Sequence, residues 1–327
     1  MPTARRLRER FAPKPDIPRP DDIDAKLKRL ELHISRRLEG MLHGDHLGLL
    51  PGHGSERAES RAYRVGDDVR RMDWAVTART SVPHVGDLIA DRELTTYAVV
   101  DLTASMDFGT HTWEKRDLAL AAVTAFGVLT TRLGSRFGVT TLVGSGAGTT
   151  IIDTPPRSGR DALRRAMRHV AATPRSAPTR PDGSTPETRP LTTALESLGR
   201  RGLRRGLVVV VSDLLGDPQD WSRALRALTS RHQVLVVEIR DPREQSLPSV
   251  GVVTLTDPET GAQLEVNTGS AALRQRYEAA AAAQRAAVAA TIRSARASHL
   301  VLSTDSNWLL DIARFVAAAR RTRGSAR

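Results

Sequence analysis

The residues that could do chemistry in this chain stand where two apolar runs end. The first run is followed by Asp101, Thr103 and Ser105, so a carboxylate and two hydroxyls occupy every second position. The second run, residues 207–211, is followed by a serine and then by Asp213. Carboxylate and hydroxyl oxygens are ligands that small, hard cations such as Mg²⁺ prefer. The pattern therefore predicts a cation-binding loop that a second acid could complete.

The two runs lie in a region where predicted strands and helices alternate. The expected strands are residues 96–101, 137–142, 149–152, 207–212, 233–239 and 299–302, with a hairpin at 251–256 and 262–266. The expected helices are residues 114–133, 158–170, 191–198, 218–231, 271–297 and 306–320. Such alternation is typical of a doubly wound, mostly parallel sheet with helices on both faces. Ligands collect beyond the carboxyl ends of such strands, so we expect Asp101 and Asp213 to converge there.

Composition divides the chain into three parts. Residues 1–20 are rich in proline and charge and are predicted to be a flexible lead-in. Residues 21–93 form an N-terminal accessory region, which begins with an amphipathic helix reaching about residue 40. Residues 94–322 form the α/β domain, interrupted at 173–190 by a loop rich in Pro, Thr and Arg.

The accessory region contains a stretch, residues 61–80, in which acids and arginines alternate and nearly balance in charge. Arg–carboxylate forks can hold an irregular segment in place, which favours a structural brace to the main domain. A partner-binding surface is the alternative. The residues expected to form this network are Asp67, Asp68, Arg70, Asp73, Trp74 and Arg79.

Composition also excludes several classes of protein. The 327 residues carry a formal net charge of +12, but the basic residues are spread along the chain and aromatic residues make up only 4%. A nucleic-acid-binding face would need clustered basic residues and stacking platforms, so no nucleic-acid partner is expected. Cysteine is absent, which excludes disulfides, thiolate metal sites and cysteine nucleophiles. Since no apolar run approaches the roughly 18 residues of a membrane span and no secretory signal is recognisable, we expect a cytoplasmic monomer.

The residues after the first strand resemble the metal-ion-dependent adhesion site of von Willebrand factor A-like domains, with Thr103 at the first hydroxyl position. The wider chain, from about residue 30 to 320, resembles the bacterial family called domain of unknown function fifty-eight. The motifs that carry this likeness are Gly66-Asp-Asp-Val-Arg-Arg-Met-Asp-Trp74, Ala78-Arg-Thr80, Asp91-Arg-Glu-Leu94, Asp101-Leu-Thr-Ala-Ser-Met106 and Ser303-Thr-Asp-Ser-Asn-Trp308. The resemblance implies a von Willebrand factor A-like fold. It also implies a MoxR-type AAA+ ATPase as partner, because members of the family are typically encoded beside one.

The same resemblance implies a site for Mg²⁺ or Mn²⁺. Thr103 and Ser105 would touch the metal, and Asp101 and Asp213 would hold it largely through waters. A position would stay open for an Asp or Glu side chain of another protein, which makes partner binding metal-dependent.

One ligand of the family pattern, a threonine shortly before a helix, is not clearly placed. Arg189 stands about where that threonine should be, and Thr188 is its neighbour. Two alternatives follow. Either Thr188 or Thr185 completes the metal site, or the guanidinium of Arg189 pairs with the acids and replaces the cation.

These observations favour a non-enzymatic protein-interaction module. An Arg-rich nucleic-acid binder is one alternative, and an Asp101-dependent phosphohydrolase is another. The phosphohydrolase motif requires a second acid where Thr103 stands. No serine-protease order, phosphate-binding glycine loop or paired-histidine helix motif supports another enzyme.

Overall fold

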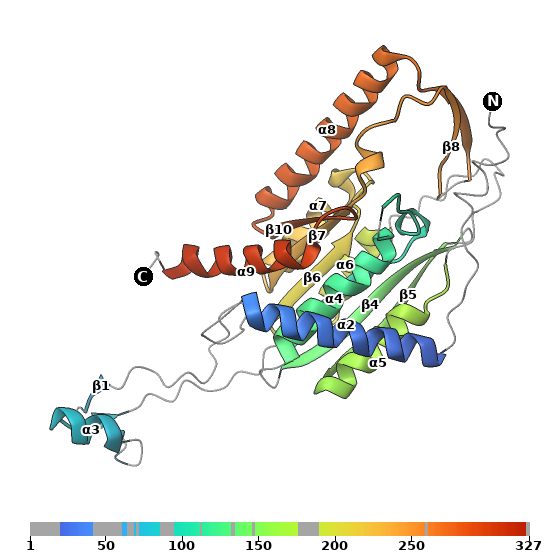
Figure 1. Cartoon of the computed structure of the whole chain (residues 1–327). Coiled ribbons are helices and arrows are strands. Elements are labelled where there is room, and N and C mark those ends of the chain that lie inside the picture. The colour runs from blue at the N-terminus through green and yellow to red at the C-terminus, as the bar shows by residue number, and fades with distance from the viewer. Residues whose placement is uncertain are drawn as a thin grey trace.

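The computed structural model describes residues 20–41, 61–63, 69, 72–85, 95–111, 113–131, 135–145, 148–175, 190–258 and 261–324. The predicted lead-in before residue 20 and most of the predicted loop at 173–190 lie outside these ranges. Figure 1 shows a twisted central sheet with helices on both of its faces. The strands of this sheet are β3 (Thr95–Asp101), β4 (Arg136–Ser145), β5 (Gly148–Ser158), β6 (Leu207–Ser212), β7 (Gln233–Arg240) and β10 (Ser298–Ser303).

The strand order is β10-β7-β6-β3-β4-β5, and every neighbouring pair is parallel except β4 with β5. The expected doubly wound, mostly parallel sheet is therefore confirmed. The helices are α2 (Pro20–Met41), α4 (Lys115–Thr131), α5 (Arg160–Ala172), α6 (Pro190–Arg200), α7 (Pro218–Thr229), α8 (Ala271–Ser294) and α9 (Trp308–Gly324), with short 3₁₀ turns η2 (Ala104–Met106) and η3 (Pro242–Glu244).

The central strands are buried on both faces, which explains their unbroken apolar sequences. Every residue of β3 and β6 is buried. Because successive side chains of a strand point to opposite faces, Val100 packs with α2, α4, α5 and α9, while Val99 packs with α6, α7 and α8. Two hydrophobic layers thus hold β3 and β6 in place, and the polar residues that follow these strands are held with them.

The edge strand β5 is longer than its sequence predicts. The pattern predicts a strand of four residues, because Pro155 and Pro156 normally end a strand, yet β5 continues through both to Ser158. Its antiparallel pairing with β4 has a register shift between Phe137 and Val139. Proline lacks a backbone N–H and is tolerated in edge strands and beside bulges, so the extension is physically reasonable.

The helix α2, which the sequence assigns to the accessory region, packs into the same core as α4 and α5. Ile23, Leu27 and Ile34 are buried there, and Arg164 pairs with Glu31 at 2.9 Å on the rim of this contact. The start of the accessory region therefore contributes to the stability of the α/β domain.

The charged segment forms a small unit of β1 (Arg61–Ala62), α3 (Trp74–Thr80) and β2 (His84–Val85). Asp73 caps α3 by accepting the backbone N–H groups of Ala75 and Val76, both at 3.1 Å. Trp74 is 70% exposed. The acids Asp67 and Asp68 and their neighbour Arg70 lie outside the described residues, so the expected fork network stays a prediction.

The expected hairpin is present as β8 (Val252–Thr256) and β9 (Gln263–Asn267), and it leads into the long helix α8 (Figure 1). The buried residues of α8 are Val288 and Ile292, both in its C-terminal half. Among the described residues, no helix combines the length and the apolar character that a membrane span requires.

Candidate functional site

The candidate site is built where β3 and β6 end side by side. Val100 of β3 lies opposite Val211 of β6, so the next residues, Asp101 and Ser212, also lie together. The Ser212 hydroxyl donates to Asp101 Oδ2 at 2.7 Å. Asp213 follows directly, and both carboxylates are buried. The two acids expected to converge from the strand pattern are thus placed at the same edge of the sheet.

Thr103 and Ser105 complete a tight polar turn after β3. Asp101 Oδ1 accepts hydrogen bonds from the backbone N–H of Thr103 at 3.0 Å and from its hydroxyl at 2.7 Å. The hydroxyl oxygens of Thr103 and Ser105 lie 3.2 Å apart. Because Ser105 lies within the 3₁₀ turn η2, which Thr103 precedes, the alternate residues of this loop gather their oxygens instead of pointing apart.

An internal cation, Lys115, lies beside Asp213. Its Nζ donates to Asp213 Oδ2 at 2.8 Å and also pairs with the carboxylate of Glu244. The ring centroid of Phe108 lies 5.7 Å from the ammonium, and the lysine side chain is fully buried. From the sequence, Arg189 was expected as the possible internal cation. Arg189 and Thr188 lie outside the described residues, and Lys115 was not anticipated.

Among the described residues, the carboxylates of the site outnumber the cations that pair with them. Burial, and next the negative charge of Asp213, raise the pKa of Asp101 to about 6. Burial also raises the pKa of Glu244, although Lys115 opposes that change. Burial alone would lower the pKa of Lys115, but the two acids around it outweigh burial and raise it. The ammonium is therefore charged and is shared by Asp213 and Glu244.

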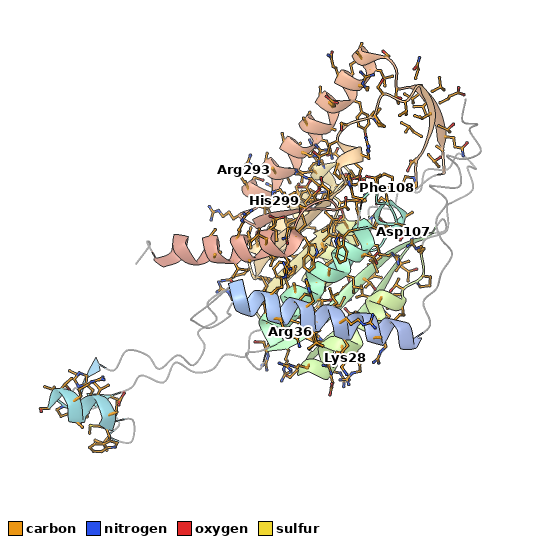
Figure 2. The ribbon with its side chains drawn as sticks, in the orientation of Figure 1. Lys28, Arg36, Asp107, Phe108, Arg293 and His299 are labelled. Atoms are coloured by element: carbon orange, nitrogen blue, oxygen red, sulfur yellow. The ribbon has the colours of Figure 1, made fainter. Side chains whose placement is uncertain are left out.

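A third strand, β7, ends beside the site, and the residue after it anchors two neighbouring segments. Asp241 is fully buried and accepts the backbone N–H and the hydroxyl of Thr110 at 2.8 and 2.7 Å. It also accepts the hydroxyl of Thr304 at 2.8 Å. Figure 2 shows Asp107 and Phe108 in the loop that Thr110 anchors, next to the start of α4. The same strand-end rule that selected Asp101 could have selected Asp241.

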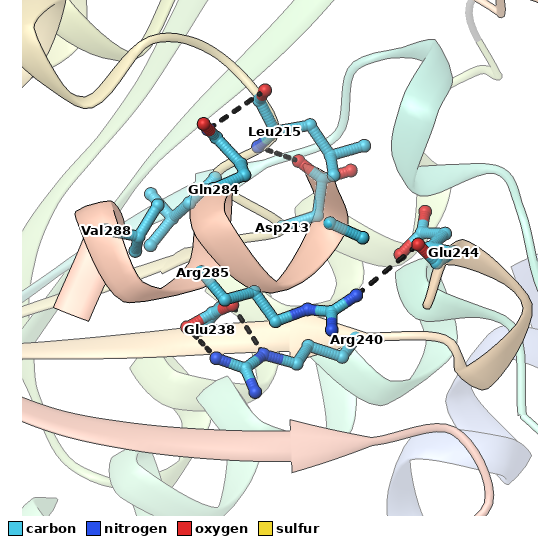
Figure 3. A pocket seen from close by; sticks show the side chains of 10 residues that line it. Asp213, Leu215, Glu238, Arg240, Glu244, Gln284, Arg285 and Val288 are labelled. Carbon is cyan, nitrogen blue, oxygen red and sulfur yellow. Dashed lines mark hydrogen bonds and ion pairs between the residues drawn. The ribbon is translucent and has the colours of Figure 1, made fainter. Parts of the chain in front are cut away.

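A small cavity of about 60 Å³ adjoins the site on the side of α8. In Figure 3 Asp213 and Glu244 line one side of it, and Arg285 reaches the Glu244 backbone carbonyl, at 3.3 Å. Across the cavity, Arg240 forms a fork on Glu238 with distances of 2.5 and 2.8 Å. The guanidinium of Arg240 is thus occupied by Glu238, and the positive charge in contact with Asp213 is that of Lys115.

The donor set of the site fits a small, hard divalent cation. Adjacent ligands of an octahedral Mg²⁺ at about 2.1 Å are about 3 Å apart, and the hydroxyl oxygens of Thr103 and Ser105 have nearly this separation, 3.2 Å. The described residues contain no cluster of three or more His, Asp or Glu suited to a metal. A metal here would therefore be held mainly by hydroxyls, with Asp101 and Asp213 as its anionic partners.

The comparisons with known proteins define the family. Residues 59–287 match the family described as Protein of unknown function DUF58, and the chain belongs to this family. Uncharacterised proteins of Mycobacterium tuberculosis and Mycobacterium bovis are each 50% identical over 305 residues, covering 92% of this chain and 92% of theirs. The family membership expected from the charged segment and the strand-end motif is confirmed.

Solved structures with low sequence identity are also similar. BatB from Bacteroides thetaiotaomicron is 13% identical, with a TM-score of 0.39, over 70% of this chain and 99% of that one. An aerotolerance-related membrane protein from Bacteroides fragilis is 12% identical, with a TM-score of 0.41, over 69% and 99%. A von Willebrand factor type A protein from Catenulispora acidiphila is 17% identical, with a TM-score of 0.32, over 62% and 44%.

Proposed function

We propose that this protein is a non-enzymatic protein-interaction module whose sheet edge binds Mg²⁺ or Mn²⁺ and takes a carboxylate from a partner. The observation that carries the proposal is the turn in which Asp101 gathers the hydroxyls of Thr103 and Ser105 beside Asp213. Few anionic ligands leave a bound cation able to accept another carboxylate. A MoxR-type AAA+ ATPase is the proposed partner, and this part rests on the family resemblance alone.

A role for Asp101 as a nucleophile is less well supported. Both of its oxygens already accept hydrogen bonds, from Thr103 and from Ser212. Thr103 also stands where a phosphohydrolase would need a second acid to protonate the leaving group. The arrangement suits holding a cation better than attacking a phosphoryl group.

The metal part of the proposal is tested by thermal unfolding of the whole chain with Mg²⁺, with Mn²⁺ and with chelator. A ligand that binds only the folded state raises its stability by mass action, so we expect either metal to raise the Tm of the wild type. The rise should vanish in Asp101→Ala and persist in Asp217→Ala, whose carboxylate caps α7 at an exposed position. A wild-type Tm that is the same with metal and with chelator would contradict the metal site.

The partner part is tested separately, by measuring binding of the purified chain to a MoxR-type ATPase from the same organism. Wild type and Asp101→Ala are compared in the same Mg²⁺-containing buffer, because the ATPase itself needs Mg²⁺ for its nucleotide. We expect the variant to bind at least about tenfold more weakly. Equal binding by both would mean that the partner uses another surface.

A further inference from the structure

We propose that Lys115 is a built-in counter-cation of the site, which neutralises its Asp213 side without a metal and so keeps the affinity for divalent cations low. The inference rests on the metal site proposed above and concerns how strongly that site binds. It is supported by the position, the contacts and the charge of Lys115.

The position of Lys115 is unusual for a lysine. It is the first residue of α4, and its backbone N–H donates to the Phe108 carbonyl at 2.8 Å. A positive charge at a helix N-terminus is opposed by the helix dipole. Lysine side chains are also rarely fully buried, yet this one is, with its stem enclosed in the domain. The contacts of the ammonium must therefore compensate for both the helix dipole and the burial of the charge.

Those contacts are two carboxylates and an aromatic ring. Asp213 accepts from Nζ at 2.8 Å, Glu244 forms the second ion pair, and Phe108 covers the ammonium at 5.7 Å. Glu244 is itself fixed, because its second oxygen accepts the backbone N–H of Asp241 at 3.2 Å. The lysine is held between elements that are far apart in sequence, and it occupies Asp213 Oδ2.

The net charge of the carboxylates around Lys115 determines how this lysine affects cation binding. Among the described residues, the carboxylates of Asp101, Asp213 and Glu244 have one ion-pair partner, the Lys115 ammonium, which leaves these four groups with a formal charge of −2 when all are ionised. One divalent cation would balance this charge. Without Lys115 the same cluster would carry −3 and attract a divalent cation more strongly, and without the Glu244 carboxylate it would carry −1 and attract it less.

The proposal is tested by titrating the whole, chelator-stripped protein with Mg²⁺ in a calorimeter, with thermal unfolding in parallel. We expect Lys115→Met to bind Mg²⁺ about tenfold or more tightly than wild type, since a unit charge in contact with a ligand carboxylate is removed. Glu244→Gln, which keeps the side chain's size and one acceptor oxygen, should bind severalfold more weakly. Arg243→Met removes an exposed positive charge next to Glu244 and should bind like wild type.

The outcomes separate this inference from the metal site itself. Equal affinities for wild type and Lys115→Met would overturn the inference, while a Mg²⁺ effect in wild type that Asp101→Ala abolishes would keep the metal site. Binding by Lys115→Met but not by wild type would support the inference, because it would mean that Lys115 alone satisfies the site, and would contradict a metal site in the natural protein. If Lys115→Met does not fold, Glu244→Gln decides: weaker binding supports the inference and unchanged binding overturns it. Absence of binding by every variant would overturn both proposals.

Discussion

Asp101→Asn is expected to stabilise the metal-free protein at neutral pH by about 3 kcal/mol. The pKa of Asp101 is raised from 3.8 to about 6, first by burial and then by the charge of Asp213. A raised pKa means that the ionised carboxylate is less stable in the folded than in the unfolded state, by about 1.4 kcal/mol per unit. Asparagine cannot ionise, so this cost disappears.

The dependence of the effect on pH follows from the same shift. Below about pH 4 both states hold the proton, and Asp101 does not change the free energy of unfolding. Between about pH 4 and 6 the unfolded state loses its proton while the folded state keeps it, so stability falls as pH rises. Above about pH 6 the cost is constant. The advantage of Asp101→Asn should therefore grow from acid to neutral pH and then level off.

Denaturant unfolding in chelator at a series of pH values measures this advantage. Asp217→Asn is the matched control, because Asp217 is an exposed helix cap and asparagine caps as well as aspartate. With Mg²⁺ present, the advantage of Asp101→Asn should shrink, since only the wild type gains stability from the metal. A loss of stability in Asp101→Asn with chelator at neutral pH would mean that the hydrogen bonds from Thr103 and Ser212 matter more than the buried charge.

The strand ends of this site could be predicted from the sequence because β3 and β6 are buried throughout. A strand covered on both faces is an unbroken apolar run, and the first polar residue after it marks its end. Asp101 stands at such a position, and Asp213 directly follows Ser212, which stands at the other. Parallel neighbours end at the same edge of the sheet, so the doubly wound topology by itself brought these two acids together.

Lys115 and Glu244 could not be predicted in this way, since Lys115 begins a helix and Glu244 lies in a 3₁₀ turn, and neither directly follows a strand. Lys115 lies 98 residues from Asp213 and 129 from Glu244, and no local spacing relates them. One signal was present. Arginine greatly outnumbers lysine in this chain, which has only four lysines, and one of them stands at a helix start, where the dipole favours acids. A compact ammonium suits a buried pair of carboxylates there, where a guanidinium would need more room.

The second large effect is expected for Asp241→Ala, which should destabilise the protein by about 3–5 kcal/mol at neutral pH. Asp241 is fully buried and joins the end of β7 to two distant segments, through Thr110 and Thr304. It also accepts the backbone N–H of Arg243 at 2.9 Å. Alanine would leave these donors buried without an acceptor, and the loop that carries Phe108 would lose its anchor.

Asp241 and Asp101 stand at the same edge of one sheet but should respond to pH in opposite ways. Burial alone would raise the pKa of Asp241, but the hydrogen bonds from Thr110, Arg243 and Thr304 outweigh burial and lower it. A lowered pKa gives stability that is present above the unfolded-state pKa and is lost as pH falls through the folded-state pKa. Asp241 is thus already satisfied by its donors, whereas no cation of the described part of the chain forms an ion pair with Asp101.

Denaturant unfolding of Asp241→Ala beside Asp217→Ala checks this difference. The control removes an exposed cap and should cost only about 1 kcal/mol, and the cost of Asp241→Ala should shrink in acid, where the wild-type carboxylate also loses its charge. Equal costs for the two variants would show that Thr110 and Thr304 find other acceptors. In that case the Lys115 contacts hold the loop that carries Phe108. Lys115→Met should then loosen this loop.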